Sequence, residues 1–201
     1  MSTANVLEPP FLFFPVGLNL RGRRCVVIGN DREAREKDEA LREVGADVLW
    51  IKDEALLRED DVAEAFFVIA TPQDEALAVH LRALADRYRF LLCAIDQPKH
   101  GFVAMQAVVK AGPARIAIST GGISPRVGGV LRAALQGALD GTFERFIECL
   151  GVQRQRNRVR LADSKARRAA MMRSAEGFEV EVSVRYPQWF EEELEGLRPD
   201  A

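Results

Sequence analysis

The feature that most constrains the fold is a set of four short apolar runs rich in β-branched and aromatic residues, at 24–29, 48–51, 66–70 and 90–95. Continuous apolar runs of this length are typical of strands buried on both faces of a parallel sheet. Charged, helix-favouring segments separate the first run from the second and the third from the fourth. Strands that alternate with helices predict right-handed crossovers and an α/β, Rossmann-like parallel-sheet domain, which we place at residues 1–100.

The pattern changes after Asp96. Residues 102–110 and 115–119 are two β-like runs around Ala111-Gly112-Pro113, which predicts a hairpin. A glycine-rich turn follows, and we expect helices at 127–139 and 143–173. Residues 101–142 therefore form a second, β-containing region. Residues 143–201 form a C-terminal helical part with an acidic tail.

Composition restricts the class of protein. The chain is 48% hydrophobic with a net charge of -2, which suits a globular core and argues against a general nucleic-acid binder. No apolar run reaches the ~18 residues that span a membrane, and no signal core opens the chain. Cys25, Cys93 and Cys149 are widely spaced and form no CxxC pair, which favours reduced thiols. We expect a cytoplasmic protein without a membrane or nucleic-acid partner.

The turn after the first predicted strand is the first candidate site. A dinucleotide site needs G-x-G-x-x-G/A there, so that backbone N–H groups and a helix N-terminus approach a pyrophosphate. Gly29 and Ala34 fit the first and last positions, whereas Asp31 replaces the middle glycine. Its carboxylate suits a helix N-cap but repels a diphosphate, at a cost on the order of a few kcal/mol. The residues alone leave a cofactor loop and a plain capped turn equally open. The candidate contacts are Gly29, Asn30, Asp31, Arg32 and Glu33.

Asp96, which closes the fourth predicted strand, is the second candidate. Ligands of open α/β sheets gather outside the carboxyl ends of the strands, where a carboxylate can act as a base or a metal ligand. An aspartate that only caps the following Asp-x-Pro turn is the alternative. His100 is close in sequence and is a candidate helper. The two histidines of the chain, His80 and His100, do not have the spacing of metal ligands.

Two further segments are candidates for binding anions. The turn Ser119-Thr120-Gly121-Gly122 offers backbone amides and two hydroxyls, although a tight turn that needs glycine is an equal interpretation. Seven basic residues lie between Arg154 and Arg168, and a solvated helix face competes there with a surface for a polyanion.

The ordered set of segments resembles the precorrin-2 dehydrogenase family of siroheme biosynthesis. Residues 13–23 resemble its apolar opening before "L-x-G-R", and residues 26–46 resemble its strand, glycine turn and helix ending in "E-x-G-A". Residues 68–71 resemble its "V-I-A-A-T" strand end, and 94–98 its "N-V-V-D-x-P" segment. Residues 117–125 match "A-I-S-T-G-G-x-S-P" almost completely and are the most specific signal.

The resemblance implies an NAD-dependent oxidation of precorrin-2 to sirohydrochlorin by a homodimer, with residues 101–142 as the dimerisation region. Some members also insert iron, so Fe²⁺ is a further implied substrate, with Asp96 as its ligand. Asp96 matches the family's key aspartate, which takes part in proton removal. Ser119, Thr120, Gly121, Gly122 and His100 are the implied tetrapyrrole contacts. Asp53, Glu54 and Thr71 join the turn residues as implied nucleotide contacts.

Two departures from the family keep a second interpretation open. The usual G-G-G turn is replaced here by Gly29-Asn30-Asp31, and residues 52–65 are shorter than the family's extra strand and loop. These changes favour a degenerate member that is a chelatase, or a tetrapyrrole-binding or partner protein, over a dehydrogenase. An unrelated nucleotide-sensing module is a third interpretation.

Overall fold

The computed structural model describes residues 13–197 of the 201-residue chain. The chain divides into two compact units, Met1–Asp140 and Gly141–Ala201. Each unit is described by itself below.

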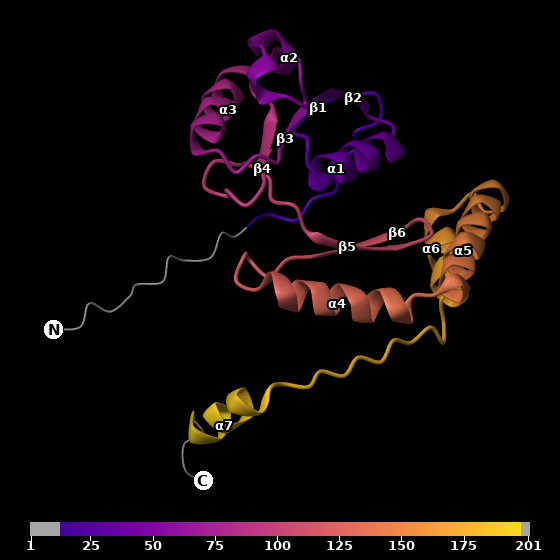
Figure 1. Ribbon diagram of the computed structural model, residues 1–201. Helices are drawn as coiled ribbons and strands as arrows, with labels where there is room; N and C mark the ends of the chain where they lie inside the picture. The colour runs from indigo at the N-terminus through magenta and orange to yellow at the C-terminus, as the bar shows by residue number, and fades with distance from the viewer. Residues whose placement is uncertain (1–12, 198–201) are drawn as a thin grey trace. The chain divides into compact units, whose positions relative to one another are not determined.

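A parallel sheet forms the centre of the first unit (Figure 1). Its strands, in the order β2-β1-β3-β4, are β1 (Arg24–Ile28), β2 (Asp47–Ile51), β3 (Phe67–Ala70) and β4 (Leu91–Ala94). The prediction of a Rossmann-like parallel sheet is confirmed. The chain leaves β1 towards β2 on one side and returns to β3 on the other, so the strand order reverses beside β1. Open α/β sheets bind ligands at such a reversal, outside the carboxyl ends of the strands.

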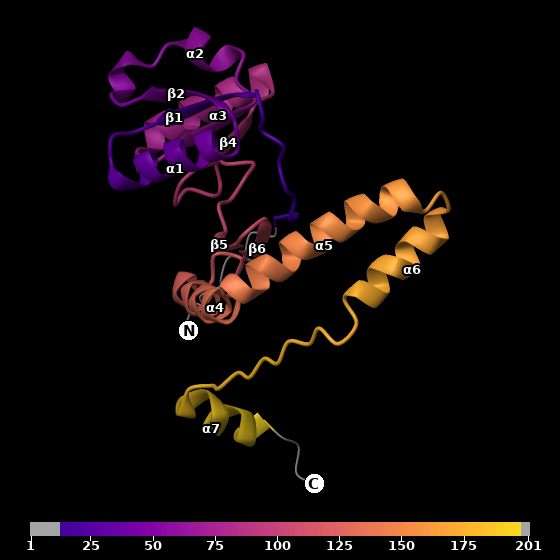
Figure 2. The ribbon, with the colours of Figure 1, turned by 90° about the vertical axis from the view of Figure 1, so that its right-hand side faces the viewer.

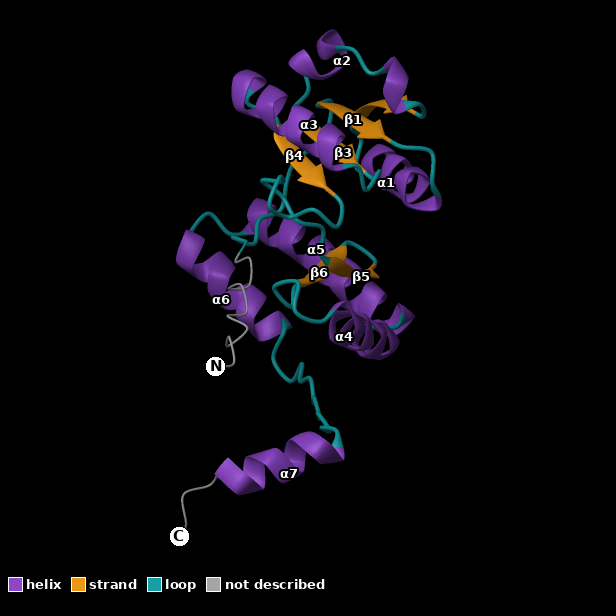
Figure 3. Ribbon diagram, turned by 60° about the vertical axis from the view of Figure 1, so that its left-hand side comes forward, coloured by secondary structure: helices purple, strands orange, loops and turns teal. Residues whose placement is uncertain are grey.

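Helices cover both faces of this sheet (Figure 3). Val26 and Ile28 point to one face, where they pack with Leu81 of α3 (Glu75–Tyr88) and with α2 (Glu59–Ala63). Cys25 and Val27 point to the other face and pack in a cluster with α1 (Arg32–Glu43). The period of two along a strand explains this division. The acidic interval after β2 forms a short 3₁₀-helix, η1 (Glu54–Leu56), followed by α2.

The predicted hairpin is present as an antiparallel ribbon of β5 (Ala107–Ala111) and β6 (Ala114–Ile118), with α4 (Pro125–Ala138) packed against it. The expectation that the first strand begins at residue 102 is wrong. The backbone N–H groups of Phe102 and Val103 both donate to the carbonyl of Leu92, at 2.7 and 3.0 Å. These contacts hold the chain beside the sheet before the ribbon begins.

The second unit contains α5 (Gly141–Arg160), α6 (Ser164–Ser174) and α7 (Gln188–Leu197). The expectation of helix throughout 143–173 is wrong at residues 161–163. The side chain of Asp163 accepts the N–H of Ala166 at 2.8 Å and starts a new helix. The Arg167 side chain donates to the carbonyls of Leu161 and Ala162 in the break between the two helices. Part of the expected acidic tail lies in α7. None of the helices in residues 13–197 is long and apolar enough to cross a membrane.

Candidate functional site

The glycine turn after β1 is built from the ends of three neighbouring strands. Gly29 has φ 128°, a conformation that favours glycine, and a Cβ at this position would collide with Oγ1 of Thr71. The Thr71 hydroxyl donates to the carbonyl of Ile28 at 3.4 Å, and Trp50 Nε1 donates to the carbonyl of Gly29 at 2.8 Å. The turn is therefore fixed from both sides at the reversal of the strand order.

Asp31 caps α1 at this turn. Its Oδ1 accepts the backbone N–H of Ala34 at 2.7 Å. That bond, aided by the Thr71 hydroxyl, holds the pKa of the Asp31 carboxyl below its usual value. An ionised carboxylate therefore occupies the helix N-terminus, the position at which a dinucleotide site receives a phosphate.

The neighbours of Asp31 point along the outside of α1. Asn30 and Arg32 are exposed. Arg32 pairs with Glu36 at 2.7 Å, and Glu33 pairs with Lys37 at 3.0 Å. Arg32 is the cation closest in sequence to the cap, and its side chain is 92% exposed.

The carboxyl end of β2 opens into a shallow cavity of about 610 Å³. Its lining includes Trp50, Lys52 and Asp53. Asp53 accepts the N–H of Ala55 at 3.0 Å and so starts η1, and the adjacent Glu54 is exposed. The Asp53 carboxylate thus lies one strand away from the glycine turn, on the same edge of the sheet.

Asp96 follows β4 at this edge and is exposed. Its φ is 58°, the left-handed region, which costs a non-glycine residue roughly 1–2 kcal/mol and which aspartate tolerates better than most. Gln73, from the loop after β3, donates from Nε2 to Asp96 Oδ2 at 3.0 Å. Gln97 donates to the carbonyl of Pro72 at 3.5 Å, while its Oε1 is buried and has no partner within the described residues.

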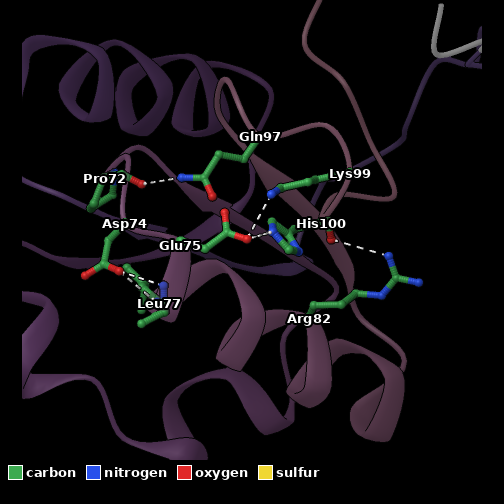
Figure 4. A network of polar contacts seen from close by, with 9 residues as sticks. Pro72, Asp74, Glu75, Leu77, Arg82, Gln97, Lys99 and His100 are labelled. Atoms are coloured by element: carbon green, nitrogen blue, oxygen red, sulfur yellow. Dashed lines mark hydrogen bonds and ion pairs between the residues drawn. The ribbon is translucent and has the colours of Figure 1, made fainter. Parts of the chain in front are cut away.

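Glu75, in the first turn of α3, ties the rest of the Asp96 loop down (Figure 4). Its Oε1 lies 2.9 Å from Nζ of Lys99 and 2.9 Å from Nε2 of His100. Lys99 first, and then His100, lower the pKa of the Glu75 carboxyl. Arg82 donates to the His100 carbonyl at 3.5 Å. His100 therefore acts here as a tether of the loop.

The glycine-rich turn before α4 lines a separate cavity of about 250 Å³, together with Pro98 and Met105. Ser119, Thr120, Gly121 and Gly122 all contribute to its wall. The Thr120 hydroxyl donates to the carbonyl of Ser124 at 3.0 Å, and Ser119 Oγ accepts the N–H of Gly121 at 3.2 Å. Because Pro98 belongs to the loop that begins at Asp96, the two candidate segments meet at this cavity.

The structure therefore gathers the candidates of the first unit at the carboxyl edge and at the adjoining cavity, whereas the basic residues between Arg154 and Arg168 lie on α5 and α6 of the second unit. Gln73, Glu75 and Lys99 were missed by the sequence analysis. Gln73 and Glu75 lie in a polar stretch directly after the third apolar run, and Lys99 lies in the polar stretch after the fourth run, so only their position after a strand marked them. Within residues 13–197, no group of three or more His, Cys, Asp or Glu side chains is arranged to hold a metal ion.

Comparison with known proteins agrees with this architecture. A family model described as putative NAD(P)-binding matches residues 16–107. The chain is 27% identical to the siroheme synthase of Nitrosococcus oceani, over 92% of this chain and 42% of that protein. It is 32% identical to the siroheme synthase of Xylella fastidiosa, over 83% of this chain and 38% of that protein. The chain thus spans about two fifths of the length of these relatives.

One solved structure, SirC, a precorrin-2 dehydrogenase, superimposes with a TM-score of 0.65. The match covers 82% of this chain and 90% of SirC at 16% identity, which establishes a shared fold. The matched region of the siroheme synthases, the NAD(P)-binding family model and this fold coincide on one stretch of sequence. These comparisons support the precorrin-2 dehydrogenase and siroheme synthase N-terminal family as the one that this chain resembles.

Proposed function

We propose that this chain is an NAD-dependent dehydrogenase of siroheme biosynthesis, which oxidises precorrin-2 to sirohydrochlorin. The observation that carries the proposal is the position of Asp96. Its carboxylate is exposed at the carboxyl edge of the sheet, and the loop that it begins lines the cavity of the glycine-rich turn.

The turn after β1 fits a dinucleotide. Gly29 lies in the tight turn at the reversal of the strand order, where dinucleotide sites bind the pyrophosphate, and Asp53 on the same edge would accept the hydroxyls of a ribose. Asp31 weakens this fit, and Arg32 is close enough in the chain to offset part of its charge. When bound, NAD⁺ supplies the hydride acceptor.

Asp96 would act as the base that removes a proton from the macrocycle. Gln73 orients the carboxylate through one oxygen, Oδ2, which leaves Oδ1 for the substrate. Glu75 holds the loop through Lys99 and His100, so we assign these residues to positioning. The turn 119–122 would receive one edge of the tetrapyrrole, with its backbone amides facing a carboxylate group.

The proposal extends to assembly and location. Residues 101–142 would join two copies into a homodimer, because the β5–β6 ribbon has open strand edges within the described residues. The chain would act in the cytoplasm, where thiols stay reduced. Burial raises the pKa of Cys25 and Cys93 to about 11, so both remain protonated and unreactive at neutral pH.

The test follows precorrin-2 oxidation and NADH formation by absorbance. Asp96→Asn keeps the shape of the side chain and removes the base, so we expect the rate to fall by roughly 10²–10⁴-fold with NAD⁺ affinity unchanged. Asp60→Asn, on exposed α2, is the matched control and should turn over like the wild type. An Asp96→Asn variant as fast as the wild type would refute the assignment of Asp96.

Insertion of Fe²⁺ into sirohydrochlorin is a second candidate function. The observation that favours it is the ionised carboxylate of Asp31 at the phosphate position, because a chelatase needs Asp96 but no dinucleotide. Iron would then be a substrate that Asp96 receives. Siroheme formation from sirohydrochlorin and Fe²⁺ without NAD⁺, lost in Asp96→Asn, would establish this activity.

A further inference from the structure

Residues 178–186, which we call the alternating segment, join α6 to α7 as an extended stretch (Figure 2). Apolar and polar side chains alternate along it without interruption, as Phe178, Glu179, Val180, Glu181, Val182, Ser183, Val184, Arg185 and Tyr186. Strict alternation is the signature of a strand with one buried face. Within the described residues, however, this segment pairs with no strand.

The apolar face of the segment is uncovered. Its five apolar side chains are exposed by 47% for Phe178, 56% for Val180, 70% for Val182, 58% for Val184 and 56% for Tyr186. The two ends are held, because the ring of Phe178 stacks on Phe146 of α5 with centroids 5.2 Å apart and the ring of Tyr186 lies 5.3 Å from that of Phe190 in α7. A continuous apolar row of this kind marks an interaction surface.

The charges on the other face select the partner. A parallel, in-register pair of segments would place Glu179 beside Glu179 and Arg185 beside Arg185. An antiparallel pair centred on Val182 places Glu179 opposite Arg185 of the other copy, twice by symmetry. Opposite charges directly across two strands stabilise the pair, and like charges destabilise it. The same register sets Phe178 opposite Tyr186, and aromatic pairs are favourable across strands.

Neighbouring registers are poorer. Centring the pair on Glu181 sets that carboxylate opposite itself. Centring it on Ser183 also gives an opposite-charge pair, Glu181 with Arg185, but it sets Phe178 opposite Gln188 and Pro187 opposite Glu179, and proline has no N–H to donate to a ladder. A slip of one residue mixes the apolar and polar faces. The register centred on Val182 combines the opposite-charge pairs with the aromatic pairs and leaves proline out of the ladder, so it is the favoured one of these registers.

We infer that the alternating segment pairs antiparallel with the same segment of a second copy of this chain, centred on Val182. The contact uses no residue of the proposed dehydrogenase site and goes beyond that function. A two-stranded ribbon is only marginally stable by itself in water. The contact therefore adds stability to a pair of chains that other contacts already hold close together.

Cysteine cross-linking tests the register directly in the full-length chain with Cys149, the exposed native thiol, changed to Ser. In the inferred register the two copies of residue 182 face each other at roughly 4.5–5.5 Å between Cα atoms, within disulfide range. The two copies of residue 183 lie diagonally at about 7–8 Å, outside that range. Val182→Cys should therefore form a cross-linked dimer at least ~10-fold faster than Ser183→Cys. Equal rates, or a faster Ser183→Cys, would overturn the register.

Charge exchange tests the polar face in the Val182→Cys background. Arg185→Glu alone, or Glu179→Arg alone, creates two like-charge pairs and should slow cross-linking by about tenfold. The double exchange, Glu179→Arg with Arg185→Glu, restores two attractive pairs and should recover the original rate. If the double variant stays as slow as the single variants, the inference is wrong. These readouts are independent of NAD⁺ binding and of turnover.

Discussion

At the scale of single residues, the site depends on three positions that depart from ordinary backbone or charge preferences. Gly29 and Asp96 both have positive φ, and Asp31 places a negative charge at the N-terminus of α1, beside the turn that we propose for NAD⁺. Glycine adopts positive φ without cost, whereas the left-handed conformation of Asp96 is costly, and such strain is typical of functional sites. Asp31 stabilises α1 at the expense of anion affinity.

Gly29→Ala separates close packing from backbone strain. The new Cβ would meet Thr71 in a left-handed backbone, so we expect a loss of unfolding free energy of about 2–4 kcal/mol. Gly122→Ala is the control, because Gly122 also has positive φ, at 79°, but has open space around it. Its cost should be about 1–2 kcal/mol. Denaturant unfolding measures both, and equal losses would contradict the role of the Gly29–Thr71 contact.

At the scale of elements, Glu75, the first residue of α3, holds the loop after β3 against the loop after β4. Asp74 caps α3 through the N–H groups of Ala76 and Leu77, at 2.7 and 3.2 Å, and this cap fixes Glu75 below the Asp96 loop. The strands and the helix between β3 and β4 were predictable from local sequence. The contact of Glu75 with Lys99 and His100 was not, because it joins residues 24 and 25 positions apart.

Glu75→Gln should remove the contact of this side chain with Lys99 and His100. It should also make the unfolding free energy less dependent on pH in the acid range. The folded-state pKa of Glu75 is lowered from its ordinary 4.5, so its stabilising effect is present above that value and is lost as pH falls through the folded pKa. The difference in unfolding free energy between wild type and variant should therefore narrow below about pH 4.5. Glu39→Gln, on an exposed position of α1, is the control. A pH-independent difference for Glu75→Gln would contradict the ion-pair assignment.

At the scale of the whole chain, the buried core belongs to the first unit. Both core clusters lie on the parallel sheet, whereas α5 and α6 contain no buried residue. The apolar runs made the sheet predictable, because a strand that is buried on both faces has a continuous apolar sequence. The break at residues 161–163 carries no glycine or proline, so only the capping aspartate marked it. The self-pairing that we infer for residues 178–186 involves a second copy of the chain, so the fold of one copy cannot show it.

Hydrogen exchange should reflect this uneven distribution of the core. Amides of β1 and β3, which are buried on both faces, should exchange only through global unfolding. Amides of α5 and α6 should exchange through local opening, at least ~10-fold faster. If the amides of α5 exchanged as slowly as those of β1, the second unit would be more stable than its lack of buried residues predicts, which would contradict this account.

The central claim is that the carboxyl edge of this sheet receives NAD⁺ at the turn after β1. Calorimetric titration with NAD⁺ tests it in the wild type, in Asp31→Gly and in Asp163→Gly, which removes an equivalent helix cap outside the site. The account predicts saturable binding by the wild type, affinity at least ~10-fold higher in Asp31→Gly, and no change in Asp163→Gly. Absence of binding at millimolar NAD⁺ in both the wild type and Asp31→Gly would contradict it.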